Sequence, residues 1–474
     1  MLNRLFSLLF RRGDGRHEAE RARAEAERRD FHALNAVAPV KDALADTSPA
    51  ASPAATGLEG EADAAVARSV ICREAVLNRE QRVAGYQFML RKSTRDRIHG
   101  QSRRIHHVYN EVLVRNLIQY SIDTLLGHRL AFIDVLDSFL ANPVIEQLPG
   151  RGIVLTVVPW DADAAADGLA GRAAELRKRG FSLALEDCFS GPHFDALATH
   201  ADYFVVPTAR HSPAEITRLA DGLKARSASA VLVAKDLASF DDFQLCSKLG
   251  FACFQGPFVT SREDWTGHQV GPQTLRVYDL LNRLRRDAAT AELADILKQD
   301  AVLSYRLLRY INSAASGLHQ TITSIEHALV IMGRDQMYRW LTLLLFGSAQ
   351  ASPYAAALLE NALVRGRLME LVGGERFPQG ERDGLFVVGL FSLLDLVLQV
   401  PLADALKPLH LPEAFSGALL RNAGPYSPFL ELAIACESFD QEQIRAASDR
   451  CGTDLTTVNA CHFAALAWAQ QIQL

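Results

Sequence analysis

Between residues 68 and 260, short β-branched runs alternate with stretches of helical period, and this alternation constrains the fold more than any other feature. VICREAVLN (70–78) and VAGYQFML (83–90), separated by REQR, predict a β-hairpin. Six further strands are expected at 130–135, 152–158, 182–187, 203–206, 230–235 and 251–256. Because helical stretches separate the later runs, their strands must pair in parallel through crossover connections. About eight such strands predict a small barrel of the TIM kind that begins with an irregular hairpin.

Beyond a polar stretch at 262–275 the strand pattern stops, and helical periods continue to the end of the chain. In TSIEHALVIMG, Thr323 and Glu326 have the spacing of a capping box, and Gly333 is expected to end the helix. The expected fold class is therefore α/β plus all-α. A TIM-barrel-like domain at 67–262 is followed by a linker at 263–275 and a helical domain at 276–474.

Residues 1–66 are expected to lie outside both domains and to be mostly disordered. Residues 14–30 are nearly all charged or Ala, which allows at best a polar helix. Residues 37–66 are rich in Ala, Pro, Ser and Gly, a composition that cannot bury a core and is typical of a linker. The apolar positions within residues 2–12 are expected to belong to a frayed N-terminal helix, and the alternative is a peripheral membrane contact.

Charge and cysteine content restrict the class of protein. The net charge is only -5 and no basic block dominates a predicted domain, so nucleic acid is not an expected partner. The 7 cysteines include no CxxC pair and no zinc spacing, which is typical of reduced cysteines in a cytoplasmic protein. The longest apolar stretch, residues 385–400, contains Asp395 and is predicted to be a buried core helix rather than a membrane span.

Two carboxylates stand side by side at the end of the apolar run SLALED, namely Glu186 and Asp187. In TIM barrels the chemistry lies at the carboxyl ends of the strands. Paired carboxylates at such a position are typical ligands of a divalent cation. The question is whether this strand end belongs to a working metal site.

The residues around this pair resemble those of EAL domains, the cyclic di-GMP phosphodiesterases. ALEDCFSG is similar to the DDFGTG-type loop of the family, and YQFMLR (86–91) falls where the family has its Glu-Ala-Leu-x-Arg signature. VAKDLAS (233–239) and FQGPF (254–258) follow in the family's order. The helical half resembles an HDOD domain, notably in ILKQDAVLSYRLLRYINSAA and SIEHALVIMG. The resemblance to an EAL–HDOD signalling protein covers about 400 residues.

The EAL resemblance implies a set of site positions, and most of them have changed here. The signature Glu, a metal ligand in the family, is replaced by Gln87, and the ligand Glu of the AEG stretch by Lys235. Of the family's polar site residues, Arg91, Gln255 and the acidic pair keep their chemical character, and Asp134 could still bind a cation. The positions that correspond to the family's metal and catalytic residues are Gln87, Asp134, Thr156, Glu186, Asp187, Val205, Lys235 and Ala238.

These replacements argue against metal-dependent cleavage of a phosphodiester, which needs a cation to activate water and neutralise phosphate. A fixed ammonium at Lys235 would repel a nearby Mg²⁺ by several kcal/mol at an effective dielectric constant of ~20. We therefore expect no catalytic residues, no metal and no cofactor. Lys235 is expected to pair with Glu186 or Asp187 in place of the cation, and the alternative is that it reaches solvent unpaired.

The helical half also lacks the residues of an enzyme. HDOD domains resemble HD phosphohydrolases, which hold metal with a His-Asp doublet, and this chain has no adjacent His-Asp pair. Ser392 and Leu393 stand in the place of the doublet. The residues that match the HDOD motif are expected to cap and close helices; they are Asp300, Asn312, Ser313 and Gly333.

The resemblance implies a non-catalytic bacterial signalling protein in the cytoplasm that acts through contacts with other signalling proteins. The alternative is a receptor that binds cyclic di-GMP without cleaving it, with Arg91 and Gln255 near the nucleotide. Nucleotide binding would be weak, because the cation that neutralises its phosphates is gone. An active phosphodiesterase is a third interpretation, which Gln87 and Lys235 oppose.

Overall fold

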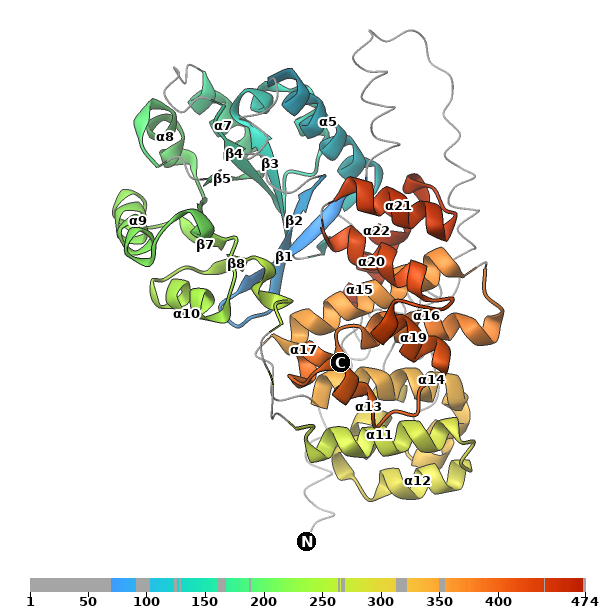
Figure 1. Cartoon of the computed structure of the whole chain (residues 1–474). Helices are drawn as coiled ribbons and strands as arrows, with labels where there is room; N and C mark the ends of the chain where they lie inside the picture. Colours follow the sequence, from blue (N-terminus) through green and yellow to red (C-terminus); the bar gives the residue numbers. More distant parts are fainter. Residues whose placement is uncertain are drawn as a thin grey trace, which may run out of the picture. The chain divides into compact units, whose positions relative to one another are not determined.

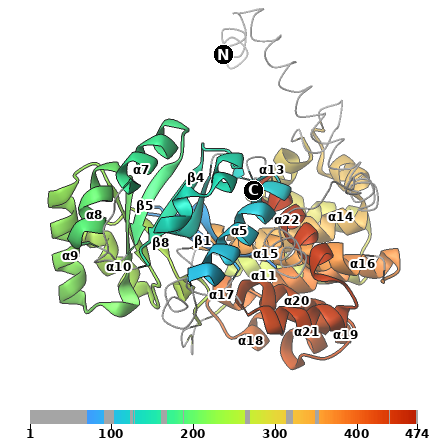
Figure 2. The same ribbon diagram turned by 90° about the horizontal axis from the view of Figure 1, so that it is seen from above.

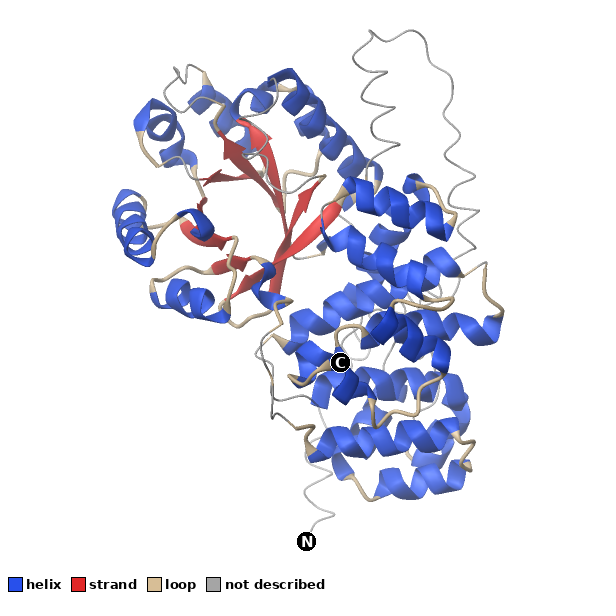
Figure 3. Cartoon of the chain, viewed as in Figure 1, coloured by secondary structure: helices blue, strands red, loops and turns tan. Residues whose placement is uncertain are grey.

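The computed structural model describes residues 70–90, 103–122, 126–127, 129–160, 168–186, 189–262, 265, 269–312, 322–348, 354–374, 376–438 and 440–471. Its strands form one closed barrel in chain order (Figure 1). The strands are β1 (Cys72–Asn78), β2 (Val83–Met89), β3 (Leu130–Leu136), β4 (Ile153–Val158), β5 (Ser182–Glu186), β6 (Tyr203–Pro207), β7 (Val231–Lys235) and β8 (Cys253–Gln255). Figure 3 shows these strands in red.

The first strand gives the barrel its irregularity. β1 runs antiparallel to both of its neighbours, β2 and β8, whereas all the other neighbouring strands are parallel. The predicted TIM-like barrel with an initial hairpin is thereby confirmed. Observed strand ends differ from the predicted ones by up to two residues, as at β8, because the apolar run continues into the flanking turns.

Alternating side chains fill the barrel interior, because successive residues of a strand point to opposite faces. The interior cluster draws residues from seven of the eight strands; it comprises Val76, Phe132, Val154, Ala184, Val205, Val233 and Cys253. The barrel is therefore a packed core below its mouth, as in other TIM-type barrels.

Helices that follow the strands cover the outside of the barrel (Figure 1, Figure 2). They are α5 (Arg103–Gln119), α7 (Leu169–Lys178), α8 (Gly191–Leu197), α9 (Pro213–Arg226) and α10 (Phe240–Lys248). In α9, Ile216, Ala220 and Leu223 are buried along one face, and Ser212 forms a capping box with Glu215. Short 3-10 helices lie at η2 (Asp137–Ala141), η3 (Pro143–Gln147), η4 (Ala198–His200), η5 (Thr208–Arg210) and η6 (Pro257–Val259).

The rest of the described chain is helical, as predicted. Its helices are α11 (Pro272–Arg285), α12 (Thr290–Lys298), α13 (Ala301–Ile311), α14 (Ile325–Ser348), α15 (Ala355–Gly373), α16 (Gln379–Phe391), α17 (Leu394–Leu398), α18 (Leu402–Leu406), α19 (Glu413–Arg421), α20 (Ser427–Ser438), α21 (Gln441–Cys451) and α22 (Leu455–Gln471). Within the described part, no helix has both the length and the apolar character needed to cross a membrane.

The chain divides into two compact units. Residues 279–340 form one, and the barrel together with the helices from residue 341 onward forms the other. The C-terminal helices therefore pack on the barrel within a single unit. They do so at the hairpin: the ring of Phe88 stacks on Phe463 of α22 with centroids 6.2 Å apart. The backbone N–H of Ile71 donates to Asn459 of α22 over 2.9 Å.

Helix ends in the smaller unit show what the polar motif residues do. The carboxylate of Asp300 accepts from the N–H groups of Val302 and Leu303, which caps α13. The amide of Asn312 exchanges two hydrogen bonds of 2.7 Å with the backbone of Ile322 and closes the end of α13. Gly333 interrupts α14 with φ 67° and ψ 179°, a conformation that favours glycine.

The expected capping box at Thr323 is wrong by one residue. The hydroxyl of Ser324 accepts from the N–H of His327 over 3.1 Å, and α14 begins at the next residue, Ile325. Glu326 is turned instead toward Lys298, with which it forms an ion pair. The local sequence allowed either hydroxyl to cap, and in the structure Ser324 does so.

Candidate functional site

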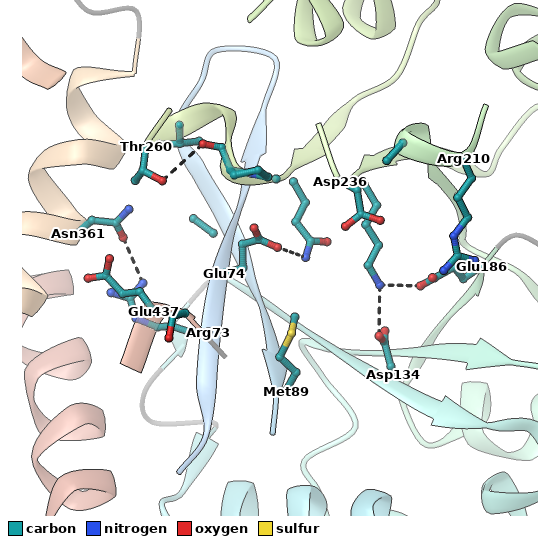
Figure 4. A pocket seen from close by; sticks show the side chains of 18 residues that line it. Arg73, Glu74, Met89, Asp134, Glu186, Arg210, Asp236, Thr260, Asn361 and Glu437 are labelled. Carbon is teal, nitrogen blue, oxygen red and sulfur yellow. Dashed lines mark hydrogen bonds and ion pairs between the residues drawn. The ribbon is translucent and has the colours of Figure 1, made fainter. Parts of the chain in front are cut away.

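A buried ion-pair cluster lies at the carboxyl ends of three barrel strands. Nζ of Lys235, at the end of β7, lies 2.7 Å from Oε2 of Glu186 at the end of β5. The same Nζ lies 3.2 Å from Oδ2 of Asp134 on β3. All three side chains are buried, and Figure 4 shows the ammonium between the two carboxylates. Odd-numbered strands of a TIM-type barrel contribute to the same interior layer, which is why these three side chains meet.

Gln87 extends this cluster to β2. Its Nε2 donates to Oδ1 of Asp134 over 2.9 Å, so Asp134 accepts from both Gln87 and Lys235. Gln87 is buried as well. Thr156 lies beside Asp134 in the strand register, with a buried hydroxyl that has no hydrogen-bond partner among the described residues. Val205 is packed into the barrel core, and Ala238 is exposed in the loop after β7.

The electrostatics of the cluster favour a charged lysine. Burial by itself lowers the pKa of Lys235, but the charges of Asp134 and Glu186 outweigh it and hold that pKa above its usual value. Burial raises the pKa of Glu186, and the ammonium of Lys235 opposes this shift without reversing it. Since both carboxyl groups favour the charged form of Lys235, the cluster holds one fixed positive charge at its centre.

This set of side chains does not fit a divalent cation. Mg²⁺ and Ca²⁺ require oxygen ligands, but Oδ2 of Asp134 and Oε2 of Glu186 are bonded to an ammonium and Oδ1 of Asp134 accepts from Gln87. A protonated lysine has no lone pair to offer a metal. In the described part of the chain, no group of three or more His, Cys, Asp or Glu side chains is arranged to hold a metal ion.

A cavity of about 500 Å³ opens above the cluster, and we call it the mouth cavity. Within it, Nε2 of Gln255 donates to Oε2 of Glu74 over 2.6 Å. Its lining combines the strand ends with side chains of α15 and α20. The lining residues are Arg73, Glu74, Ala75, Met89, Asp134, Glu186, Ala209, Arg210, Lys235, Asp236, Gln255, Gly256, Pro257, Val259, Thr260, Asn361, Glu437 and Ser438.

A second buried network ties the hairpin to α15. The hydroxyl of Tyr86 and the guanidinium of Arg129 both donate to the carboxylate of Glu360. Nη2 of Arg129 lies 2.8 Å from Oε2 of Glu360. Burial and the negative charge of Glu360 raise the pKa of Tyr86 far above its usual value, so the phenol remains a donor. Tyr86 and Gln87 point to opposite faces of β2, and thus one strand carries both the cluster and the network.

Sequence reasoning missed this second network. Arg129 and Glu360 are 231 positions apart, and each is an ordinary charged residue of its local segment. A buried tyrosine between them gives no periodic signal. The one available sign is that Tyr86 precedes a signature position, which places its side chain on the outside of the barrel.

Three of the sequence-predicted site residues, Arg91, Asp187 and Ser313, lie outside the described residues. So does the predicted membrane contact at residues 2–12, together with the whole of 1–66. Lys235 was expected to pair with Glu186 or Asp187, and its pairing with Glu186 is observed. Its second partner is Asp134, a contact that the sequence did not suggest.

His462 on α22 interacts with Arg73 and with the backbone of Ile71, and its burial leads to a prediction on how stability depends on pH. Burial and the charge of Arg73 lower the pKa of His462 from 6.5 to about 3, against a hydrogen bond with the backbone of Ile71. Since the folded state disfavours protonation of His462, the stability that neutral His462 contributes is fully present above pH 6.5 and is lost as the pH falls below it. From pH 7.5 to pH 5.5 the free energy of unfolding of the original chain should fall by about 1.4 kcal/mol more than that of a His462→Gln variant. Urea unfolding of both proteins at the two pH values measures this, and equal losses would contradict it.

Comparisons with known proteins agree with this architecture. The HDOD domain family model matches residues 274–409. The uncharacterized protein YuxH of Bacillus subtilis is 21% identical over 413 residues, which cover 85% of this chain and 99% of YuxH. Cyclic di-GMP phosphodiesterase CdgJ of Vibrio cholerae is 23% identical over 403 residues, which cover 85% of this chain and 92% of CdgJ.

Among solved structures, the EAL enzyme Bd1971 with cAMP and cyclic di-GMP bound has a TM-score of 0.33 and 14% identity. The alignment covers 42% of this chain and 62% of Bd1971. Bacillus subtilis YkuI, an EAL-domain protein in complex with cyclic di-GMP and calcium, has a TM-score of 0.35 and 15% identity. That alignment covers 52% of this chain and 75% of YkuI. The HDOD match and the two relatives that align along most of its length support the assignment of this chain as an EAL–HDOD protein.

Proposed function

We propose that this protein is a non-catalytic bacterial signal-transduction protein that acts through contacts with other signalling proteins. In this proposal the barrel has lost the phosphodiesterase activity implied by the EAL resemblance, and the HDOD domain serves as the output. The proposed compartment is the cytoplasm, in keeping with cysteines that are all free and buried in the described part.

The observation that supports this proposal is the position of Lys235. Its ammonium bridges Asp134 and Glu186 at 3.2 and 2.7 Å, where the EAL resemblance implies a bound cation. Gln87 stands where the family has an anionic ligand and donates to Asp134. Hydrolysis of a phosphodiester by a metal-activated water would have to displace a buried salt bridge first. Because the relative CdgJ is named a cyclic di-GMP phosphodiesterase, activity needs a direct test.

A second candidate function is a cyclic di-GMP receptor. The mouth cavity favours it, since about 500 Å³ is within the range of small-molecule sites and Gln255 lies in the lining. The charges of the lining oppose it. Five carboxylates face the cavity against three cationic side chains, a poor environment for two phosphodiesters. The cationic side chains are Arg73, Arg210 and Lys235.

One experiment separates the three interpretations. The full chain is incubated with cyclic di-GMP and Mg²⁺ or Mn²⁺, product is followed chromatographically, and binding is measured by calorimetric titration. The proposal expects no metal-dependent product and no heat at micromolar nucleotide. Binding without product that weakens in Arg91→Ala or Gln255→Ala would establish the receptor. Formation of a linear dinucleotide that depends on the metal would overturn the non-catalytic proposal.

A further inference from the structure

Beyond the proposed function, we infer that Arg73 is the anchor of a second binding site, which takes the carboxylate of a small amino-acid-like ligand in the mouth cavity. Arg73 lies on β1, is only 6% exposed and lines the cavity. Its guanidinium lies over the ring of Tyr86, 4.9 Å from the centroid. Figure 4 shows it beside Asn361 and Glu437, away from the Lys235 cluster at the other end.

Among the described residues, Arg73 has no carboxylate partner of the kind that a buried cation requires. Its one hydrogen bond to a described residue is a long one, 3.4 Å from Nη1 to Oδ1 of Asn361. Its Nε is buried without any hydrogen-bond partner in the described part of the chain. Buried charges are normally paired, since taking them out of water is costly. A guanidinium with a buried, unused Nε–H at a cavity wall is therefore a candidate site for an anion.

The neighbouring carboxylates are engaged with other cations. Glu437 accepts from Nε and Nη2 of Arg365 over 3.0 and 2.6 Å, a bidentate pair. Glu360 is bound by Arg129. Arg365 and Arg129 are thus each paired with a carboxylate, whereas no ion pair of Arg73 with a described carboxylate is present. His462 adds no charge near neutral pH, because its pKa is lowered to about 3.

The rest of the cavity indicates which anion fits. Glu74 and Asp236 line the same space, and the Lys235 cluster carries two carboxylates for one ammonium. A multiply charged phosphate would be repelled by these groups. A ligand with one carboxylate for Arg73 and an ammonium or hydroxyl group for the acidic wall matches both ends. Asn361 and Ser438 supply polar groups beside the carboxylate position.

The test measures the thermal unfolding midpoint of the full chain at constant ionic strength, with 1–50 mM glycine, sodium acetate or inorganic phosphate. Glycine is expected to raise the midpoint in a saturable way, acetate less, and phosphate least. Arg73→Gln should reduce the apparent affinity for glycine at least tenfold, because the guanidinium that lines that end of the mouth cavity is removed. Arg218→Gln, an exposed arginine on α9, is the matched control and should respond like the original chain.

Two further variants keep the inference testable if Arg73→Gln does not fold. Arg73→Lys retains the charge and loses the planar fork, and should bind glycine several-fold more weakly. Asn361→Ala should do the same. An equal response in all variants, or no saturable response to glycine, would overturn the site. A phosphate response larger than that of both carboxylates would overturn the ligand class. None of these experiments uses cyclic di-GMP, so failure of this inference would not affect the proposed function, which the cyclic di-GMP assay tests separately.

Discussion

Lys235→Met is expected to lower the free energy of unfolding by about 3–5 kcal/mol, because it leaves two buried carboxylates facing each other without a cation. Lys235 is 6% exposed and lies within 3.2 Å of Asp134 and Glu186. Urea unfolding of the full chain measures the loss. Lys248→Met, an exposed lysine on α10, is the matched control and should change stability by less than about 0.5 kcal/mol.

The double variant Lys235→Met with Glu186→Gln separates charge from packing. It should recover part of the loss, because one of the two unpaired carboxylates becomes neutral. In Lys235→Glu, three carboxylates meet and can bind a cation. This variant should melt lower in EDTA than the original chain and rise when Mg²⁺ is added. A Lys235→Met protein as stable as the control would show that Lys235 does not hold the cluster together.

Glu360→Gln is expected to have the second large effect, lowering the free energy of unfolding by about 3–5 kcal/mol. Glu360 accepts from the phenol of Tyr86 and from both Nη atoms of Arg129, and all three residues lie between the hairpin and α15. Glutamine removes the charge and leaves Arg129 near Arg73 without a compensating anion. The measurement is again urea unfolding. Limited proteolysis should also show earlier cleavage of the C-terminal helices, which this network holds against the barrel.

Glu413→Gln provides the control for this prediction. Glu413 also pairs with an arginine, Arg421, but its side chain is 83% exposed. Exposed ion pairs contribute at most about 1 kcal/mol, so this variant should be close to neutral. Arg129→Met combined with Glu360→Met should cost less than Glu360→Gln alone, since neither member of this ion pair is left behind without the other. Similar losses for Glu360→Gln and Glu413→Gln would contradict the role of the network.

Much of the fold follows from local patterning. The β-branched runs at 130–135 and 152–158 are buried on both faces, so strand length and crossover spacing are visible in the sequence itself. The hairpin at 70–90 follows in the same way from its short connection. Helix ends are less certain from sequence. Thr323 and Ser324 are equivalent locally, and Ser324 became the cap in company with the ion pair between Glu326 and Lys298.

For the candidate site, too, some features follow from the sequence and others only from the tertiary structure. The sequence by itself determined the barrel and the helical half, because residue type and order suffice for these. Through the EAL resemblance it also predicted that Gln87 and Lys235 stand at acidic positions of the family. Only the tertiary structure decided what Lys235 binds, since closure of the barrel brings Asp134 to it across 101 positions. It also decided that Nε of Arg73 has no hydrogen-bond partner among the described residues and that Glu360 joins Arg129. Charge pairing over such separations depends on burial and distance, and neither is a property of local sequence.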